Sequence, residues 1–214
     1  MKESVFVICA HSDDQILGPG GTLAKYAKQG KEIFTIILSY GETSHFWLKK
    51  KVSVEIRVKE AQNADNVIGG SGVVFFGLTE GKILEDVKDK KIKDRIKELI
   101  KEKKPIKIFT HSVDDAHDDH RAVYKIVTEL TDEINYKGDL LSFDIWHIID
   151  FKKREKPKLY VDITDNFKTK MKALHCFRSQ RLVMLFPYIN VYIKAFINGL
   201  KNDCKHAEKF YKIK

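Results

Sequence analysis

Apolar and polar positions follow two different periods along the chain. Short continuous apolar runs are typical of strands buried on both faces, and longer segments with a period near 3.6 residues are typical of helices. Strands are predicted at residues 4–10, 32–39, 72–78, 107–112, 143–150 and 158–165. Helices are predicted at residues 18–30, 53–69, 89–104, 120–134 and 165–177, and in the tail at 183–214. Strands and helices therefore alternate through the first two thirds of the sequence.

This alternation predicts right-handed strand–helix–strand units and a parallel sheet covered on both faces. The fold class is α/β: a Rossmann-like three-layer sandwich with a mostly parallel sheet and a C-terminal helical segment. The chain has 214 residues, enough for one sizeable core. Because no linker or internal repeat divides it, we expect one domain over residues 1–214.

The excess of basic residues indicates a solvated, positively charged surface and does not indicate a nucleic-acid-binding site. Lys and Arg number 39 against 30 Asp and Glu, a formal net charge of +9. The basic residues are mostly Lys and are scattered over the predicted helices, whereas a nucleic-acid footprint would gather Arg and aromatic residues in one stripe. We therefore expect no nucleic-acid partner, and an anionic substrate or lipid headgroup stays open.

Cysteine usage and hydropathy indicate a cytoplasmic protein. Cys9, Cys176 and Cys204 form no close pair, so neither a disulfide framework nor a CxxC metal clip is expected. No segment approaches the roughly 18 consecutive apolar residues of a membrane span. The first apolar run is too short for a secretory signal.

The aromatic segment 185–196 has two interpretations. Packing against the sheet or closing over the site is favoured, because much of such a tail is core in a domain of this size. Its basic flanks also fit peripheral contact with a membrane surface, a groove for an acyl chain or a contact in a homo-oligomer.

Two loops dense in His and Asp follow predicted strands. Residues 10–15 follow the first strand, and residues 111–120 follow the fourth. Ligands of open parallel sheets bind beyond the carboxyl ends of the strands, where both loops are expected. Helix capping would explain Ser and Asp at these places, but it does not require a His next to paired carboxylates. The pattern therefore predicts a metal site.

Such a site suggests hydrolysis. A catalytic zinc has three protein ligands and one position for water, and the metal makes that water nucleophilic near neutral pH. The adjacent Asp13 and Asp14 could divide the work, one holding the metal and the other taking the proton. His and Asp ligands also accept Fe²⁺ and Co²⁺.

Six short segments occur in the order known from one enzyme family: AHSDDQ (10–15), GGTLA (20–24), Arg57 with Glu60, HDDH (117–120), Ser179 with Gln180, and HAEKF (206–210). Together they resemble the LmbE-like, or PIG-L-type, zinc-dependent de-N-acetylases. The resemblance extends over essentially the whole chain.

The resemblance implies roles for the residues of both loops. His11, Asp14 and His120 would hold zinc, and Asp13 would be the general base. His117 would stabilise the tetrahedral intermediate or protonate the leaving amine.

The resemblance also implies positioning and substrate contacts. Asp119 would orient the imidazole of His117, and Arg57 would bind substrate oxygens or phosphate. His111 ends a strand near the site, so substrate binding and a plain backbone contact are both open for it. Glu42 follows the second predicted strand, where substrate contact and ordinary surface are equally open.

The first motif departs from the family pattern. Ala10 and Ser12 replace two prolines, which relaxes the loop without removing chemistry. Gln15 replaces the usual Glu, so we expect it at the substrate and expect a changed substrate preference.

The expected reaction is hydrolysis of the N-acetyl group from an N-acetylglucosamine-like sugar, free or conjugated as a disaccharide, glycolipid or nucleotide sugar. The alternative is a catalytically silent relative that binds a sugar or nucleotide sugar. A nucleotide-binding Rossmann domain is disfavoured, because residues 18–21 (GPGG) lack the GxGxxG spacing and a Walker lysine. Close helix packing explains these glycines better.

Overall fold

The computed structural model describes residues 2–41, 50–146, 156–180 and 185–214. Within these ranges, seven strands form one sheet in the order β3-β2-β1-β4-β5-β7-β6. The strands are β1 (Ser4–Cys9), β2 (Glu32–Ser39), β3 (Gly72–Leu78), β4 (Lys107–His111), β5 (Asp139–Phe143), β6 (Lys158–Asp162) and β7 (Ala207–Lys212). Neighbouring strands from β1 to β5 pair in parallel, and β7 pairs antiparallel with both β5 and β6. The predicted mostly parallel α/β fold is confirmed.

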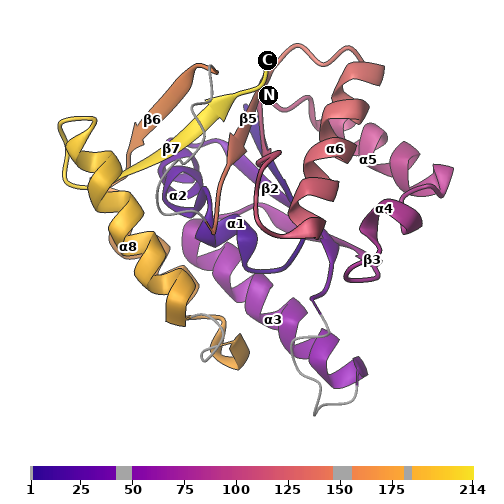
Figure 1. Cartoon of the computed structure of the whole chain (residues 1–214), viewed down its shortest axis with the longest axis horizontal. Coiled ribbons are helices and arrows are strands. Elements are labelled where there is room, and N and C mark those ends of the chain that lie inside the picture. The colour runs from indigo at the N-terminus through magenta and orange to yellow at the C-terminus, as the bar shows by residue number, and fades with distance from the viewer. Residues whose placement is uncertain (1, 42–49, 147–155, 181–184) are drawn as a thin grey trace.

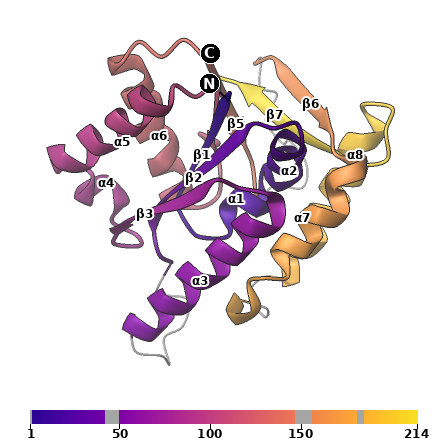
Figure 2. The same cartoon turned by 180° about the vertical axis from the view of Figure 1, so that it is seen from behind.

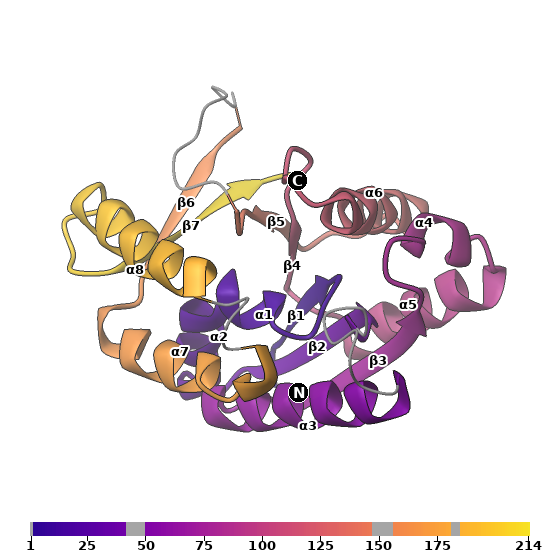
Figure 3. The same cartoon turned by 60° about the horizontal axis from the view of Figure 1, so that its bottom comes forward.

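Helices cover both faces of the sheet (Figure 1). They are α1 (Asp14–Leu17), α2 (Gly20–Lys28), α3 (Lys50–Ile68), α4 (Ile83–Asp86), α5 (Lys90–Lys103), α6 (Asp118–Glu133), α7 (Phe167–Leu174) and α8 (Leu185–Leu200), with short 3₁₀ turns η2 (Thr164–Asn166) and η3 (Arg178–Gln180). Seen from behind, α3 and α7 lie side by side (Figure 2). Figure 3 shows α2, α3 and α7 on one side of the sheet and α4, α5 and α6 on the other.

The two cores explain why β1 is apolar throughout. Successive side chains of a strand point to opposite faces. Val5 and Val7 belong to the core beneath α2, α3 and α7, whereas Phe6 and Ile8 belong to the core beneath α4, α5 and α6. All four side chains are buried. If polar residues alternated with apolar ones along β1, the polar side chains would lie in one of the two cores.

The strand order positions the functional loops. β1 pairs with β2 on one side and with β4 on the other, so the order of the strands reverses next to β1. The carboxyl ends of β1 and β4 therefore meet at this switch point, where open α/β sheets bind ligands. Both His- and Asp-rich loops begin there.

Two predicted elements differ from the observed ones. A strand was expected at 143–150, but β5 spans Asp139–Phe143, and residues 144–146 continue as a loop. The predicted strand residues 147–150 lie outside the described ranges. The tail is helical only to Leu200, and β7 then enters the sheet between β5 and β6. The helical expectation for 207–212 was wrong because pairing with two strands, rather than a local pattern, makes this segment extended.

The glycines at 18–21 serve close packing, as expected. A Cβ added at Gly18 would lie 2.3 Å from the Phe143 ring, and one at Gly21 would lie 2.6 Å from Cδ1 of Ile163. The first amides of α2 are also occupied, because Gly21 N–H and Thr22 N–H donate to the Glu208 carboxylate at 2.8 and 2.7 Å. This helix N-terminus therefore binds a carboxylate of its own chain.

Candidate metal centre and active site

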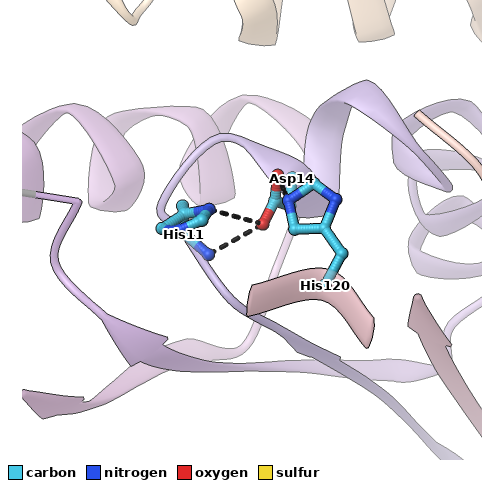
Figure 4. Close-up of side chains that lie close together, drawn as sticks. All are labelled: His11, Asp14 and His120. Carbon is cyan, nitrogen blue, oxygen red and sulfur yellow. Dashed lines mark hydrogen bonds and ion pairs between the residues drawn. The ribbon is translucent and has the colours of Figure 1, made fainter. Parts of the chain in front are cut away.

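Two imidazoles and one carboxylate converge at the switch point (Figure 4). His11 lies in the turn after β1, Asp14 opens α1, and His120 lies in the first turn of α6. Nδ1 of His11 lies 3.5 Å and Nε2 of His120 lies 3.3 Å from the Asp14 carboxylate. The three ligand atoms lie within 4.8 Å of one another, and all three residues are buried. The donor set therefore fits a metal ion.

The turn after β1 sets the direction of Asp14. His11 N–H donates to Oδ2 of Asp14 at 2.7 Å, which turns the carboxylate back toward the imidazoles. The N–H groups of Ile16 and Leu17 donate to the carbonyl of Asp13, which starts α1. Asp13 and Asp14 therefore point in different directions, although they are adjacent in sequence.

The charges of the three groups support one another. Burial alone would raise the pKa of Asp14, but the neighbouring His120, His111 and His11 outweigh it and hold that pKa well below its usual value. Burial opposes the charged form of His11, yet hydrogen bonds with Asp119 and Asp14 raise its pKa to about 10. The pKa of His120 rises to about 9 against burial, chiefly because of the Asp14 charge. Without a metal, protons on the imidazoles compensate the buried carboxylate.

Asp115 supports His120 from behind. Oδ1 of Asp115 lies 2.9 Å from Nδ1 of His120, which leaves Nε2 of that imidazole to face Asp14. Asp115 also accepts hydrogen bonds from the N–H groups of His117 at 3.1 Å and Ile145 at 3.3 Å. Burial opposes ionisation of Asp115, but the His120 hydrogen bond and charge lower its pKa to about 2. Such a carboxylate–histidine contact fixes the ring orientation of a metal ligand.

Asp119 supports His11 in the same way. Oδ2 of Asp119 lies 3.2 Å from Nε2 of His11 and accepts the N–H of Gly81 at 2.9 Å. Asp119 was expected to orient His117, and its contact with that imidazole is through the backbone: Asp119 N–H donates to Nδ1 of His117 at 3.2 Å. Nδ1 is therefore an acceptor, and neutral His117 carries its proton on Nε2. Burial and the charges of His11 and His120 lower the pKa of His117, which favours this neutral form.

Arg57 connects α3 to the turn after β1. Nη1 of Arg57 lies 3.4 Å from Oδ2 of Asp13, and its Nε donates to the carbonyl of Tyr40 at 3.1 Å. Gly41 has a φ of +68°, and a Cβ there would lie 2.7 Å from the guanidinium. Arg57 is buried, so its position beside Asp13 is fixed by α3 and this turn.

A pocket of about 120 Å³ opens above the convergent groups. Its lining includes Asp13, Arg57 and His117, together with Glu80 from the loop after β3. The lining also includes four residues from later in the chain: Ile145, Trp146, Gln180 and Pro187. Neither these four nor Glu80 were expected as site residues. Glu80 follows the carboxyl end of a strand, so the rule that indicated the two His- and Asp-rich loops could also have indicated it.

A family model described as "PIG-L: GlcNAc-PI de-N-acetylase" matches residues 6–131, more than half of the chain. Both His- and Asp-rich loops lie inside the matched region. The chain belongs to the PIG-L family.

The proteins that are similar to this chain differ from one another in the activities that their names describe. The chain is 26% identical to a probable N-acetyl-alpha-D-glucosaminyl L-malate deacetylase 2 of Bacillus cereus, over 86% of this chain and 87% of that protein. It is 23% identical to a 4-oxalmesaconate hydratase of Pseudomonas putida, over 94% of this chain and 83% of that protein. The structure of N,N'-diacetylchitobiose deacetylase from Pyrococcus horikoshii superposes with a TM-score of 0.81 at 21% identity, covering 99% of this chain and 84% of that one.

The C-terminal part of the PIG-L resemblance is connected to the site through α3. Glu60 accepts hydrogen bonds from the N–H and the hydroxyl of Ser179 at 2.8 and 2.7 Å. The residue after Ser179, Gln180, lines the pocket. Arg57 and Glu60, one turn apart on α3, thus contact residues 13 and 179, which local sequence patterns do not relate.

Two expected substrate contacts do not line the pocket. Gln15 is 1% exposed, and its side-chain amide donates to the Ser12 carbonyl at 2.9 Å within the turn. His111 is 0% exposed, stacks on His120 and accepts the Ala10 N–H at Nε2 at 3.0 Å. Neither residue is part of the lining of the pocket. Glu42, the third expected contact, lies outside the described residues.

Proposed function

We propose that this chain is a metal-dependent amidohydrolase that removes the N-acetyl group from an N-acetylglucosamine-like sugar or its conjugate. One observation carries the proposal: Asp13 and His117 line the same pocket as a buried two-histidine, one-carboxylate set, and neutral His117 carries its proton on Nε2. Amide hydrolysis needs these three functions: a polarising centre, a proton acceptor and a proton donor.

His11, Asp14 and His120 would hold Zn²⁺, or Fe²⁺ or Co²⁺, which accept the same ligands. The metal would supply Lewis-acid polarisation and a water of lowered pKa. Asp115 and Asp119 would hold the two imidazole rings in their orientations.

The other residues would move protons and bind substrate. Asp13 would accept the proton of the attacking water at its carboxylate, while Arg57 keeps that carboxylate in place. Nε2–H of His117 would donate a hydrogen bond to the carbonyl oxygen as charge develops there. The proton that Asp13 took from water would then pass to the leaving amine, so Asp13 is again a carboxylate and His117 stays neutral. Arg57 and Glu80, which both line the pocket, would contact sugar hydroxyls.

The substrate class is supported by the described relatives. Two of them act, by their names, on N-acetylglucosaminyl malate and on N,N'-diacetylchitobiose. A second function, hydration of a carbon–carbon double bond in an unsaturated carboxylic acid, is favoured by the hydratase relative. Activation of water by Asp13 would serve either reaction, so geometry alone does not separate them.

The experiment compares both reactions on one preparation. The chelator-treated protein is reloaded with Zn²⁺, Fe²⁺ or Co²⁺. Acetate release is measured from N-acetylglucosamine, N,N'-diacetylchitobiose, N-acetylglucosaminyl malate and N-acetylglucosaminyl phosphatidylinositol, and hydration is measured with 4-oxalmesaconate. We expect acetate release that is lost in Asp13→Asn and retained in Asp118→Asn. Asp118 is the matched control, because it lies in the same motif but its carboxylate pairs with Arg121 at the surface.

Three results would contradict the proposal. Hydration without acetate release would assign the chain to the second function. Sugar binding without turnover in either assay would make it a silent binding relative. Equal acetate release from wild type and Asp13→Asn would remove Asp13 from the mechanism.

A further inference from the structure

The outward face of α8 is apolar along its whole length. Among the described residues, twelve large hydrophobic side chains are exposed, and seven of them lie on this helix. Their exposed fractions range from 37% to 65%. The seven residues, the α8 apolar face, are Leu185, Phe186, Ile189, Tyr192, Ile193, Phe196 and Leu200. Spacings of three and four residues place them on one side of the helix. Single exposed apolar residues are ordinary, but a contiguous stripe indicates a binding surface.

The helix is held in this orientation by its inner face. Val191 and Ala195 are buried in the core, and α8 lies alongside β7 (Figure 1). Nζ of Lys194 donates to the carbonyls of Asp144 at 2.6 Å and Ile145 at 3.0 Å. Rotating α8 to bury the apolar face would break these contacts, so that face remains outside in the folded chain.

Lysines border the α8 apolar face. The ring of Tyr192 lies 5.1 Å from that of Phe167 on α7, and the next residue along α7, Lys168, is exposed. Lys201 follows directly after Leu200 and is exposed. The helix itself contains no Asp or Glu.

The border keeps a net positive charge when nearby carboxylates are included. Residues 165–168 and 201–205 carry three exposed lysines, at 168, 201 and 205, and two exposed aspartates, at 165 and 203. On the other side of α7, a cavity of about 690 Å³ between α3 and α7 is lined by Lys59, Lys172 and Arg178. Figure 3 shows α7 between α3 and α8, so cationic and apolar features lie on neighbouring parts of the surface.

We propose that the α8 apolar face and its lysine border dock on a bilayer surface that contains anionic lipids. The helix would lie in the interface plane with its aromatic and aliphatic side chains among the acyl chains and the lysines among the headgroups. A second copy of the chain would meet the apolar face with an identical lysine border, and each copy carries a formal charge of +9. An anionic surface neutralises that charge, whereas self-association concentrates it.

Docking also sets the position of the metal centre. Pro187, in the first turn of α8, lines the pocket above His11, Asp14 and His120. The N-terminal end of the docked helix would therefore bring the pocket entrance beside the lipid surface. The docking itself does not depend on which reaction the pocket performs.

Vesicle flotation of the full chain tests the proposal. We expect binding to vesicles of phosphatidylcholine with phosphatidylglycerol, weaker binding to phosphatidylcholine alone, and weakening by salt. Phe196→Ser should lower partitioning about tenfold or more, because it removes a buried aromatic contact with lipid. Leu84→Ser is the matched control: Leu84 is 42% exposed on α4, across the sheet, and its replacement should leave binding unchanged.

The charge contribution has its own pair of variants. Lys168→Glu should weaken binding to the anionic vesicles at least about fivefold, as expected for one cation near an anionic surface. Lys101→Glu, on the exposed side of α5, should not. All four replaced side chains are exposed, and circular dichroism confirms that each variant is folded.

Two results overturn the proposal. Vesicle binding that Phe196→Ser leaves intact would place the lipid contact elsewhere. Failure to bind anionic vesicles would exclude a membrane role for this face. In the second case, a dimer in analytical ultracentrifugation that dissociates in Phe196→Ser would assign the α8 apolar face to a second copy of the chain.

Discussion

Adjacent aspartates on one turn have different surroundings. Asp14 contacts the imidazoles of His11, His111 and His120, whereas Asp13 contacts the guanidinium of Arg57 and faces the pocket. A helix cap would require neither arrangement. The difference supports the proposed roles, Asp14 as a ligand and Asp13 as a proton acceptor, and these can be tested residue by residue.

Asp13→Asn should retain the metal and lose turnover by about 10²- to 10⁴-fold, because it removes a general base and leaves the ligand set intact. Asp14→Asn should lose the metal, because it removes the only carboxylate of the set. Elemental analysis and initial rates, measured on the same preparations, check both outcomes. Metal loss in Asp13→Asn with retention in Asp14→Asn would reverse the two roles.

Arg57→Lys should lower turnover although the charge is kept. Only the planar guanidinium can donate to the Tyr40 carbonyl through Nε while Nη1 faces Asp13. Kinetics and metal content of this variant check the prediction, with Arg95→Lys on the exposed surface of α5 as the control. Near-normal kinetics in Arg57→Lys would show that a point charge is sufficient.

Elements distant in sequence are joined by single side chains. Glu208 of β7 accepts the first amides of α2 and also pairs with Nζ of Lys170 on α7 at 2.6 Å. Both partners of this ion pair are buried. One carboxylate therefore connects the last strand, an early helix and a late helix.

Glu208→Ala should destabilise the fold by about 3 to 5 kcal/mol, because it leaves the Lys170 ammonium buried without its counter-charge. Urea unfolding at neutral pH measures the effect. Lys170→Met combined with Glu208→Ala should recover part of the loss, since no unpaired ammonium remains. Lys107→Met is the control: Lys107 pairs with Asp139 in a partly exposed position, and its loss should cost at most about 1 kcal/mol. Equal losses in Glu208→Ala and Lys107→Met would contradict the argument.

At the scale of the whole molecule, the buried imidazoles of His11 and His120 couple folding to pH. Of the described helices, none has the length and apolar character needed to cross a bilayer. The metal-free fold holds protons on His11 and His120, whose pKa values rise to about 10 and about 9 from an ordinary 6.5. Between pH 6.5 and about pH 10, the folded state therefore binds more protons than the unfolded state.

The free energy of unfolding of the metal-free protein should fall as pH rises from about 6.5 through about 9 and 10. These two groups contribute their stability fully below the unfolded pKa and lose it as each folded pKa is passed. Metal affinity should rise over the same range, because binding displaces the protons. Urea unfolding with chelator present, compared between wild type and His120→Ala, checks the first statement. A wild-type profile no steeper than that of the variant would refute it.

Local pattern in the sequence determined β1 to β4 and β6, most helices and the two loops that bear the site. A continuous apolar run marks a strand buried on both faces, and parallel strands carry their terminal loops to one edge of the sheet. These rules place residues 11 and 120 at the same edge of the sheet from the sequence alone. The PIG-L resemblance supplied their proposed roles.

Only the tertiary structure decided which side chains share the pocket. Gln15 turned inward and Glu80 turned toward the site because packing and hydrogen bonds fix these directions, and neither leaves a periodic signal. β7 became a strand because β5 and β6 offer it partners, while its own six residues lack a strand pattern. The period of apolar residues indicates which side of one helix or strand is buried. A contact such as that between Gly21 and Glu208 joins residues far apart in sequence, so it depends on the complete tertiary fold.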